Sequence, residues 1–472
     1  MPDRKPVAGA GANAAGALPT AVPPAMSASS RRAMFAILMA VGLSILDTAL
    51  ANVALPVIAA DLHTSPAASV WIVNAYQLAM VATLMPFAAL GAIVGHRRVY
   101  LLGLATFVLA SLACALSDSL ATLTAARVLQ GLGGSAVMSV NTALIRIIYP
   151  PNRLGRGMGI NTLIVGVAYA VGPTVASLIL SVASWPWLFA INVPLGGLAL
   201  LVAWPALPDS IRTGHRFDPL AAGLNVVTFA ALIYALGEAT QRGPAAWTVA
   251  TALVALLAGW LLVRREAGHP APMLPVDLFR NRSFALAATV SSSAYAAQGL
   301  AFVSLPFYLE TVQHLSQVQT GFILTPWPVF VALAAPIAGR LSDRYQPGML
   351  SGLGLAALAL GLASSALLPA NPGAFDIGIR MALCGAGFGF FQSPNLKSMI
   401  SSAPPERSGG ASAIIATSRL IGQATGAALV ALCFGLFSHH GSTVALTLGA
   451  IFAALASLLS WLRLAVRVRA AG

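Results

Sequence analysis

The chain alternates long apolar stretches with short polar connections. Fourteen apolar segments can be delimited, and most have the length of about 20 residues that a helix needs to cross a bilayer. Their approximate limits are 33–57, 71–94, 99–117, 120–148, 157–182, 185–207, 218–238, 246–263, 283–309, 320–341, 348–369, 375–400, 408–437 and 441–464. The pattern therefore predicts an all-α polytopic membrane protein with fourteen transmembrane helices.

The composition agrees with this pattern. Hydrophobic residues make up 58% of the chain and charged residues only 8%, whereas a soluble domain carries about 25% charged residues. The net charge of +13 does not indicate a nucleic-acid partner, because the basic residues form short clusters between apolar segments. The three cysteines lie inside apolar segments with spacings unlike those of metal ligands, so no metal site is expected.

The basic residues also predict an orientation. If the chain crosses the membrane at each apolar segment, 22 of the 26 lysines and arginines fall on one side. Only Arg242 and Arg380 fall on the opposite side, and Arg127 and Arg419 lie within segments. Since basic loops stay in the cytoplasm, both termini are expected to be cytoplasmic, in a multi-pass protein of a bacterial inner membrane.

A weak internal repeat predicts the division of the chain. The cytoplasmic loop sequence ALGAIVGHRR follows the second segment, and GRLSDRYQP follows the tenth. Repeated halves around a central site are a common plan of transporters. We expect two six-helix bundles at 31–207 and 271–472, with two extra helices at 208–270. Residues 1–30 are rich in Ala, Gly and Pro, and are expected to be disordered.

Asp47 is an acidic residue deep inside the first apolar segment. Counted from Arg32 at about 1.5 Å per residue, it lies roughly 22 Å into a hydrocarbon core of about 30 Å. A charged carboxyl at that depth costs roughly 3 kcal/mol on insertion scales. It is therefore expected to bind and release a proton or a cation. The alternative is a structural acid that holds two helices together.

Arg127, in the fourth segment, is expected at a similar depth to Asp47. Arg127, Gln130, Gly131 and Gly134 share one helical face, since they are spaced i, i+3, i+4 and i+7. Small residues on that face allow a close helix approach, and polar ones can bond inward. Arg127 is either an electrostatic partner that tunes Asp47 or part of a helix-packing face.

Five sequence motifs occur in order along the chain. They are LDTALANVALP around Asp47 and Asn52, RVLQGLGGS around Arg127 and Gln130, AVGPTVAS with Gly172 and Pro173, WPWLFAINVPLG, and GFFQSPNLKSMISSAPPERSGGASA. From about residue 31 onward the chain resembles the fourteen-helix drug:proton antiporters of the major facilitator superfamily. The segment TGFILTPWPVFVALAAPIAGRLSDR is most similar to the branch that exports quaternary ammonium compounds and viologens. The resemblance implies proton coupling through Asp47 and Arg127.

The superfamily loop pattern G-x-L-A-D-R-x-G-R-R is altered in the first copy. Ala92 and Ile93 stand where the pattern has its acid and the following arginine, while Gly95, Arg97 and Arg98 remain. Because this loop gates the transporter in the family that the chain resembles, the change is expected to affect gating more than the fold.

The other gating motifs also depart from the family. The second loop copy keeps Asp343 and Arg344 but has a glutamine at the glycine position. The fifth-segment motif keeps Gly172 and Pro173 but ends in Ala-Ser instead of two glycines. A proline inside a helix frees a backbone carbonyl and can bend the helix. This face either forms a bend that blocks leak or serves ordinary helix packing.

A substrate site is expected from polar and aromatic residues inside the spans. The candidates are Asn52, Gln130, Tyr295, Glu310, Trp327, Phe391, Asn395 and Arg419. The aromatic rings either contact a lipophilic cation through cation–π interactions or are ordinary packing residues. Arg419 either pairs with a carbonyl or an acid, or faces a cavity, where it would repel a cation. Glu310 is either solvated at the outer interface or part of a cation-attracting vestibule.

The function expected from these features is proton-coupled export of lipophilic cationic drugs, such as quaternary ammonium compounds, dyes, viologens and biguanides. The alternatives are export of an endogenous metabolite or a neutral antibiotic and, in another class, a membrane enzyme or receptor. No catalytic cluster of His, Asp or Ser is recognised, and no G-x-x-x-x-G-K-[ST] loop occurs, so neither an enzyme nor ATP drive is expected. No cofactor is expected. The partners are protons, small cationic molecules and the bilayer, and the protein is expected to act as a monomer.

Overall fold

The computed structural model describes residues 27–149, 154–209, 217–238, 245–267, 276–369, 372–403, 408–437 and 440–471, and these residues form helices without any strand. The helices are α1 (Ala28–Asp61), α2 (Pro66–Ser69), α3 (Trp71–Val94), α4 (His96–Ala115), α5 (Leu120–Ile148), α6 (Leu154–Val182), α7 (Pro186–Ala190), α8 (Asn192–Ala206), α9 (Pro219–Glu238), α10 (Ala245–Glu266), α11 (Arg282–Phe307), α12 (Gln317–Leu324), α13 (Pro326–Leu341), α14 (Pro347–Ala366), α15 (Ala374–Ser401), α16 (Ser408–Leu436) and α17 (Gly441–Ala471), with short helical turns η2 (Val276–Arg280) and η3 (Tyr308–Val312). The predicted all-helical class is confirmed.

Within the described residues, twelve helices are long and apolar enough to cross a membrane. Two of the fourteen predicted segments, 218–238 and 283–309, form α9 and α11, which are not among the twelve. The apolar part of α9 is shorter, Pro219–Leu232, and α11 contains a run of serines and a glutamine. The chain is thus a multi-pass membrane protein with twelve candidate spans, and the count of fourteen remains a prediction.

Three of the predicted segments are interrupted or extended by short helices. The four-residue α2 precedes α3, the 185–207 segment is divided between α7 and α8, and the 320–341 segment is divided between α12 and α13. The last interruption falls at Thr325, directly before Pro326. Thr325 keeps a helical backbone conformation, with φ −57° and ψ −36°, but Pro326 has no backbone N–H to donate, so the helical hydrogen-bond ladder is interrupted at this point.

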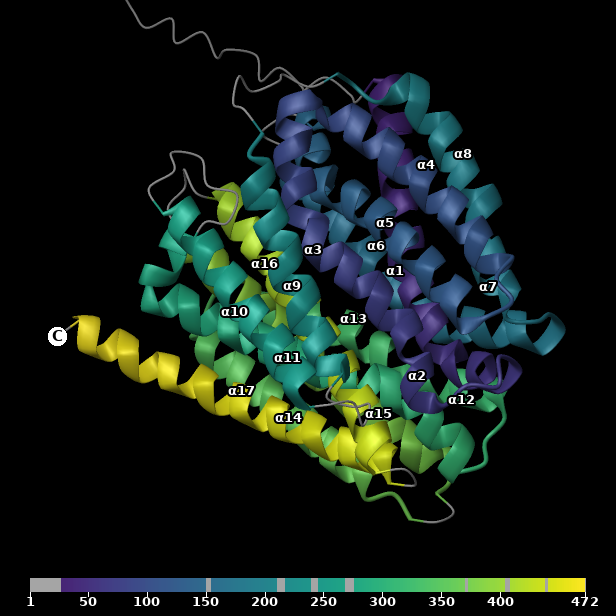
Figure 1. Cartoon of the computed structure of the whole chain (residues 1–472). Coiled ribbons are helices and arrows are strands. Elements are labelled where there is room, and N and C mark those ends of the chain that lie inside the picture. The colour runs from purple at the N-terminus through teal and green to yellow at the C-terminus, as the bar shows by residue number, and fades with distance from the viewer. Residues whose placement is uncertain are drawn as a thin grey trace, which may run out of the picture.

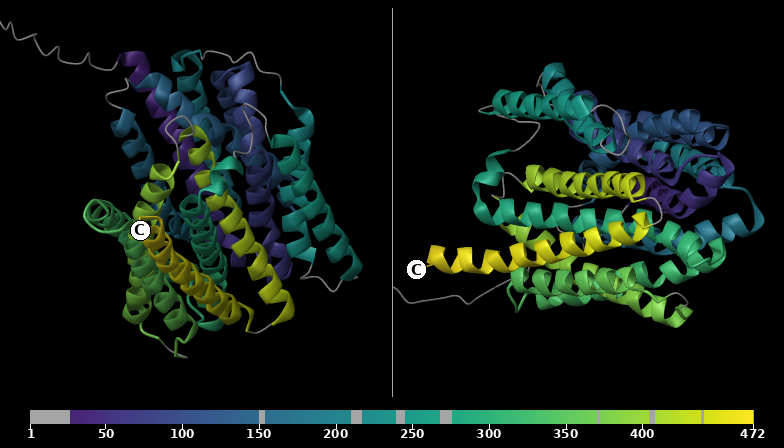
Figure 2. Two further views of the ribbon diagram at one scale, coloured as in Figure 1. Left: turned by 90° about the vertical axis from the view of Figure 1, so that its left-hand side faces the viewer. Right: turned by 60° about the horizontal axis from the view of Figure 1, so that its bottom comes forward.

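The helices run side by side in two groups (Figures 1 and 2). In the N-terminal half, α1–α8, the helix pairs that pack together include α1 with α6 and α8, and α5 with α3 and α4. In the C-terminal half, α11–α17, α14 packs on α15 and α17, and α11 on α16 and α17. The halves meet where α6 contacts α12 and α13, and where α1 contacts α11. Helices α9 and α10 pack on each other, and α9 also contacts α3 and α16.

The beginning of α1 corrects one boundary. The helix starts at Ala28, inside the 1–30 segment that was expected to be disordered, and the Ser27 side chain accepts a hydrogen bond from the backbone N–H of Ser30. An N-cap of this type satisfies a helix N–H that would otherwise lack a partner. Residues 1–26 lie outside the described part of the chain.

The outward faces of the helices are apolar. Large hydrophobic side chains such as Leu109, Leu201 and Leu256 are more than two-thirds exposed, while many buried positions hold Ala, Gly, Ser or Asn. A soluble protein rarely exposes contiguous apolar surface of this extent. In a bilayer these side chains contact lipid, and small buried residues let the helices approach one another closely.

Gly172 shows how close this approach is between α1 and α6. A Cβ built at Gly172 would lie 2.4 Å from the Cβ of Ala49 on α1, whereas a Cβ at Gly166, six residues earlier on α6, meets nothing within 4 Å. A methyl group at Gly172 would therefore push the two helices apart. This packing role is one of the two interpretations that the sequence left open for the motif.

We predict that Gly172→Ala lowers the thermal midpoint of the purified protein, because overpacking a tight contact costs about 1–3 kcal/mol. Gly166→Ala is the matched control on the same helix and should leave the midpoint unchanged or raise it, since alanine favours a helix by about 1 kcal/mol over glycine. Thermal unfolding in detergent, followed by size-exclusion chromatography, measures both. Equal midpoints for the two variants would contradict the assigned contact.

Candidate functional site

Asp47 is completely enclosed in the N-terminal half, and three side chains donate hydrogen bonds to its carboxylate. Arg127 Nη1 donates to Oδ2 at 2.5 Å. Gln130 Nε2 and Asn192 Nδ2 donate to Oδ1 at 2.8 and 2.7 Å. The donors come from α5 and from the first residue of α8, while Asp47 belongs to α1. The predicted partnership between Asp47 and Arg127 is present in the structure as a buried ion pair.

Arg127 is held by further contacts around the pair. Its Nε donates to the carbonyl of Ile72 at 3.0 Å, and its Nη1 also donates to Gln130 Oε1 at 2.5 Å. The guanidinium carbon lies 4.3 Å from the ring centre of Tyr76 and 5.5 Å from that of Phe189. Aromatic faces stabilise a cation, so the site is arranged for a charged arginine beside a charged carboxylate.

In this arrangement a proton on Asp47 would change the contacts between helices. A carboxylate accepts hydrogen bonds from all three donors, but a protonated carboxyl loses the charge that attracts Arg127. Breaking one side of a buried ion pair is strongly destabilising, by about 3–5 kcal/mol, because the other charge stays uncompensated. Loading a proton therefore weakens the contact that joins α1, α5 and α8.

The sequence reasoning missed three members of this network. Asn192 lies in WPWLFAINVPLG, which was recognised as a motif without a role for the asparagine. Ser111 on α4 accepts a hydrogen bond from Gln130 at 2.8 Å, and Tyr76 on α3 shares one with the hydroxyl of Ser44 at 2.8 Å. The available signal was a polar residue inside an apolar segment, which by itself does not tell which neighbour it faces.

A cavity of about 390 Å³ lies between α6 of the N-terminal half and α11, α13, α15 and α16 of the C-terminal half. Its wall includes three of the predicted substrate residues, Tyr295, Trp327 and Arg419. The wall also includes Tyr169, Gln298, Phe302, Phe388 and Gln392. Its volume falls within the range of small-molecule sites, about 300–1,000 Å³.

Arg419 faces this cavity. Within the described part of the chain its guanidinium forms no hydrogen bond or ion pair, and its Nε is buried. Of the two interpretations from the sequence, pairing with a carbonyl or an acid is therefore wrong for this conformation, and the cavity-facing arrangement is the one present.

Phe391 and Gln130 were expected to contact the substrate, but neither is among the residues that line the cavity. The ring of Phe391 packs edge-on against Tyr295, with ring centres 6.3 Å apart, and supports the cavity from behind. Gln130 bonds to Asp47 instead of reaching the cavity. Both residues therefore act on the site indirectly.

Glu310 lies in η3, which follows the C-terminal end of α11, and is not among the residues that line the cavity. Its Oε1 is buried without a partner, and burial raises the pKa of its carboxyl to about 7. The expected substrate contact of Glu310 is therefore not supported by its position in this conformation.

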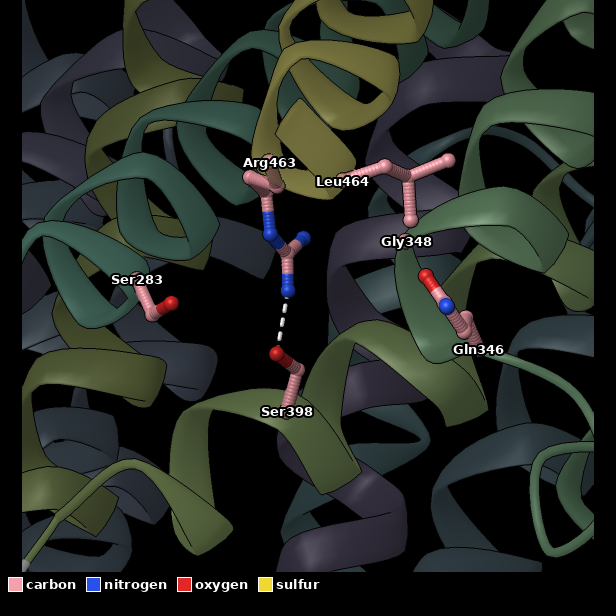
Figure 3. A pocket seen from close by; sticks show the side chains of 6 residues that line it. All are labelled: Ser283, Gln346, Gly348, Ser398, Arg463 and Leu464. Atoms are coloured by element: carbon pink, nitrogen blue, oxygen red, sulfur yellow. Dashed lines mark hydrogen bonds between the residues drawn. The ribbon is translucent and has the colours of Figure 1, made fainter. Parts of the chain in front are cut away.

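Asn395 also lies away from the cavity, in a polar cluster at the other end of the C-terminal half. Its Oδ1 accepts a hydrogen bond from Arg463 at 2.7 Å, and its Nδ2 donates to the carbonyl of Ala287 at 3.1 Å. Figure 3 shows Arg463 of α17 pointing toward Ser398 of α15, to which it also donates. Asn395 thus joins α11, α15 and α17, and its expected substrate contact is wrong for this structure.

Asn52 lines a second, small pocket of about 10 Å³ that shares part of its lining with the cavity. Thr48, next to Asp47 in the chain, lines it as well, and Tyr169, Gln298 and Phe302 line both this pocket and the large cavity. Gln423 joins the two sides, because its Nε2 donates to Tyr169 Oη and to Gln298 Oε1, each at 3.1 Å. The cavity therefore shares Tyr169, Gln298 and Phe302 with the small pocket that reaches Thr48, the chain neighbour of Asp47.

In the first loop, Gly95 has a positive φ angle, and Arg97 contacts residues of the same half of the protein. Gly95 has φ 109°, a backbone conformation that glycine adopts without strain. Arg97 pairs with Asp209 at 3.1 Å and donates to the carbonyl of Trp204 at 2.7 Å, and Arg98 is exposed. These contacts tie the start of α4 to the end of α8, within the N-terminal half.

The second loop repeats this arrangement in the C-terminal half. Asp343 accepts a hydrogen bond from Lys397 of α15 at 2.5 Å, and Arg344 is exposed. Lys397 also donates to the carbonyl of Ser342 at 2.9 Å. In the described residues each loop pair thus joins helices of its own half, and the gating role of both loops stays a proposal.

One contact between the halves involves the fifth-segment motif on α6. Thr174 and Thr325 share a hydrogen bond of 2.7 Å, and Ser177 Oγ donates to the carbonyl of Gln317 at 3.1 Å. A Cβ at Gly321 would lie 2.6 Å from the carbonyl oxygen of Pro173, so α12 rests directly on α6. On α6 this contact comes after the cavity-lining residues and therefore closes the predicted outer side of the cavity.

Comparisons with known proteins agree with this architecture. A family model described as Major Facilitator Superfamily matches residues 37–427. The chain is 52% identical to the Uncharacterized transporter YebQ of Escherichia coli (strain K12), over 92% of this chain and 95% of that protein. It is 31% identical to the Riboflavin transporter RibZ of Clostridioides difficile (strain 630), over 84% of this chain and 87% of that protein. It is 33% identical to the Multidrug resistance protein Stp of Mycobacterium tuberculosis (strain CDC 1551 / Oshkosh), over 83% of this chain and 74% of that protein.

We predict that Asn192→Ala destabilises the protein by about 1.5–3 kcal/mol, the range for a hydrogen bond to a charged group. The control is Asn225→Ala, which removes a buried bond of the same length, 2.7 Å, to the uncharged carbonyl of Ala82. It should cost less, about 0.5–1.5 kcal/mol. In an Asp47→Asn background the cost of Asn192→Ala should shrink, as a double-mutant cycle of thermal midpoints measures. Additive effects would show that Asn192 does not act on the Asp47 charge.

Proposed function

The chain belongs to the Major Facilitator Superfamily, and from this premise we propose that it is a proton-coupled antiporter that exports small aromatic compounds across a bacterial inner membrane. The observation that carries the proposal is the buried pair of Asp47 and Arg127, placed beside a cavity of small-molecule size. An ionisable group at membrane depth, with a named partner, marks an ion or proton pathway. Family membership supports transport, and the residues of the site support the proton coupling.

Proton and substrate movement are coupled because a proton and Arg127 compete for the Asp47 carboxylate. In the conformation described here Asp47 is paired with Arg127, and a hydrogen-bonded group of Tyr169, Gln298 and Gln423 lies at the cavity and the adjoining small pocket. A proton that reaches Asp47 from the outer side releases Arg127 and loosens the joint between α1, α5 and α8. Opening of the α6–α12 contact then exposes the cavity outward, and return of the proton to the cytoplasm restores the pair.

Two substrate classes compete within this function. The sequence resemblance and the aromatic wall, with Tyr295, Trp327 and Phe388, favour lipophilic cations, which bind to ring faces. Arg419 in the same wall favours neutral or anionic compounds, since a bound cation would meet a like charge. Related proteins carry names with riboflavin and with multidrug resistance, so this architecture accommodates more than one class of compound.

We predict that Asp47→Asn abolishes substrate-driven proton movement while substrate binding and protein level persist, because an amide cannot carry the coupled proton. Inverted vesicles with an acidic lumen, a pH-sensitive dye, and a panel of cationic, neutral and anionic aromatic compounds provide the measurement. Asp47→Glu should retain part of the activity. Asp118→Asn removes an exposed acid between α4 and α5 and serves as the control with normal activity. Full proton-coupled transport by the Asn variant would exclude Asp47 as the proton carrier.

We also propose fourteen spans with both termini in the cytoplasm, as a functional monomer of six, two and six helices. This adds α9 and α11 to the twelve candidate spans and is motivated by the distribution of basic residues. Reporter fusions at residue 472 and within 212–217 should read cytoplasmic, and a fusion at His440 periplasmic. A cytoplasmic reading at His440 would overturn this topology.

A further inference from the structure

The cavity wall carries one formal charge among the described residues that line it, and this charge is positive. The lining includes Arg419 but no Asp, Glu or Lys. The deep acid of the protein, Asp47, is already neutralised by Arg127, and Glu310 lies outside the lining. A guanidinium that is partly removed from water without an anion nearby is costly, because burial of a charge is tolerated when the charge is paired. The cavity therefore lacks the counter-ion that Arg419 requires.

The hydrogen bonds of the other wall residues also favour a ligand that accepts hydrogen bonds. Tyr295 Oη accepts from Gln392 Nε2, and Tyr169 Oη accepts from Gln423 Nε2, each at 3.1 Å. Each hydroxyl has one proton, and because its oxygen is already used as an acceptor here, that proton remains available to a ligand.

Two neighbouring side chains of the wall also have a free donor or an occupied acceptor. Trp327, in the same wall, has an indole N–H with no partner. The amide oxygen of Gln298 is occupied by Gln423. Among Tyr169, Tyr295, Trp327 and Gln298, the hydrogen-bonding groups that remain for a ligand are thus mainly donors.

The aromatic part of the wall indicates the shape of the ligand. Phe302 and Trp327 pack with ring centres 5.0 Å apart, and Tyr295 and Phe388 with centres 5.3 Å apart. Both pairs line the cavity together with Arg419. Aromatic walls bind flat apolar rings, and the planar fork of arginine matches the two oxygens of a carboxylate.

We propose that this cavity binds aromatic anions, compounds in which a flat ring system carries a carboxylate or a similar anionic oxygen group, and that Arg419 is the residue that pairs with this group. The inference rests on the proposed function, since it names the substrate class of the same transporter. It assigns the anion to the C-terminal half and leaves the proton to Asp47 in the N-terminal half. It also reverses the charge expected from the sequence resemblance.

The test measures binding, which is independent of proton coupling. The full chain in nanodiscs is titrated with matched probes on naphthalene and on pyrene, each carrying a carboxylate, a neutral amide or a trimethylammonium group, with empty nanodiscs as the blank. Wild-type protein should bind the carboxylate at least roughly tenfold more tightly than the trimethylammonium probe on the same ring. A carboxylate that does not bind, or binds no more tightly than the ammonium probe, overturns the inference.

Substitutions at position 419 provide the second arm. Arg419→Gln should weaken carboxylate binding roughly 10- to 100-fold, the effect of losing a charged hydrogen-bond partner, and should leave the amide probe nearly unchanged. Arg419→Lys keeps the charge without the fork and should retain part of the affinity. The charge-matched control is Arg264→Gln, outside the cavity lining at the end of α10, which should bind all probes as the wild type does. Unchanged carboxylate preference in both Arg419 variants, with normal elution profiles, contradicts the assignment.

The outcomes separate this inference from the proposed function. If the carboxylate binds through Arg419 but its transport moves no protons, the substrate class stands and the antiport proposal fails. If trimethylammonium probes bind better and drive proton movement that depends on Asp47, antiport stands and the substrate inference fails. Because Asp47→Asn should still bind the carboxylate, a loss of binding in that variant contradicts the separation of the two sites.

Discussion

A carboxylate and a guanidinium that are enclosed among apolar helices must satisfy each other, and the N-terminal half is organised around this requirement. The ion pair of Asp47 and Arg127 needs donors for the carboxylate and acceptors for the guanidinium, and neither can come from lipid. Asn192, Gln130 and the carbonyl of Ile72 supply them from α8, α5 and α3. The relative position of these helices is therefore fixed by hydrogen bonds at one point. Protonation of Asp47 would therefore weaken contacts that involve all of these helices.

Away from this point, helix contacts are made largely through small residues. Small residues at the contacts, such as Gly172 against Ala49 and Gly321 against Pro173, let backbones touch without interlocking side chains. Among the described residues, side-chain hydrogen bonds of Thr174 and Ser177 join the halves at the predicted outer side. Such bonds are individually weak, about 0.5–1.5 kcal/mol, and can be exchanged during transport. The cavity on the other side of this contact is bounded by helices from both halves, so its shape depends on their relative position.

Predictions from the sequence were good where the type and position of a residue along its own helix are enough to assign it. Apolar length predicted twelve of the fourteen segments as candidate spans, helical rise placed Asp47 and Arg127 at one depth, and aromatic residues within spans predicted part of the cavity wall. The failures concern residues whose role depends on a neighbour. Asn395 was assigned to the substrate, but Arg463, 68 positions later, occupies its amide oxygen. Asn192 was passed over, because the spacing within α8 does not reveal that its first residue faces Asp47 of α1. Depth along a helix can be counted from sequence, whereas the rotation of one helix against another is decided by tertiary packing.

The separation of the two charged sites determines what drives the exchange. Under the proposed function a proton enters on Asp47 while the substrate leaves from the cavity that contains Arg419. If the substrate is a monocation, exchange for one proton moves no net charge, and only the proton gradient acts. If it is a monoanion, the same exchange carries two positive charges inward, and the membrane potential contributes roughly 5 kcal/mol at 100 mV, at about 2.3 kcal/mol per charge. A transporter that holds its substrate with an arginine can thus use the whole proton motive force with a single carboxylate, which matches the presence of one deep acid, Asp47, in the described part of this chain.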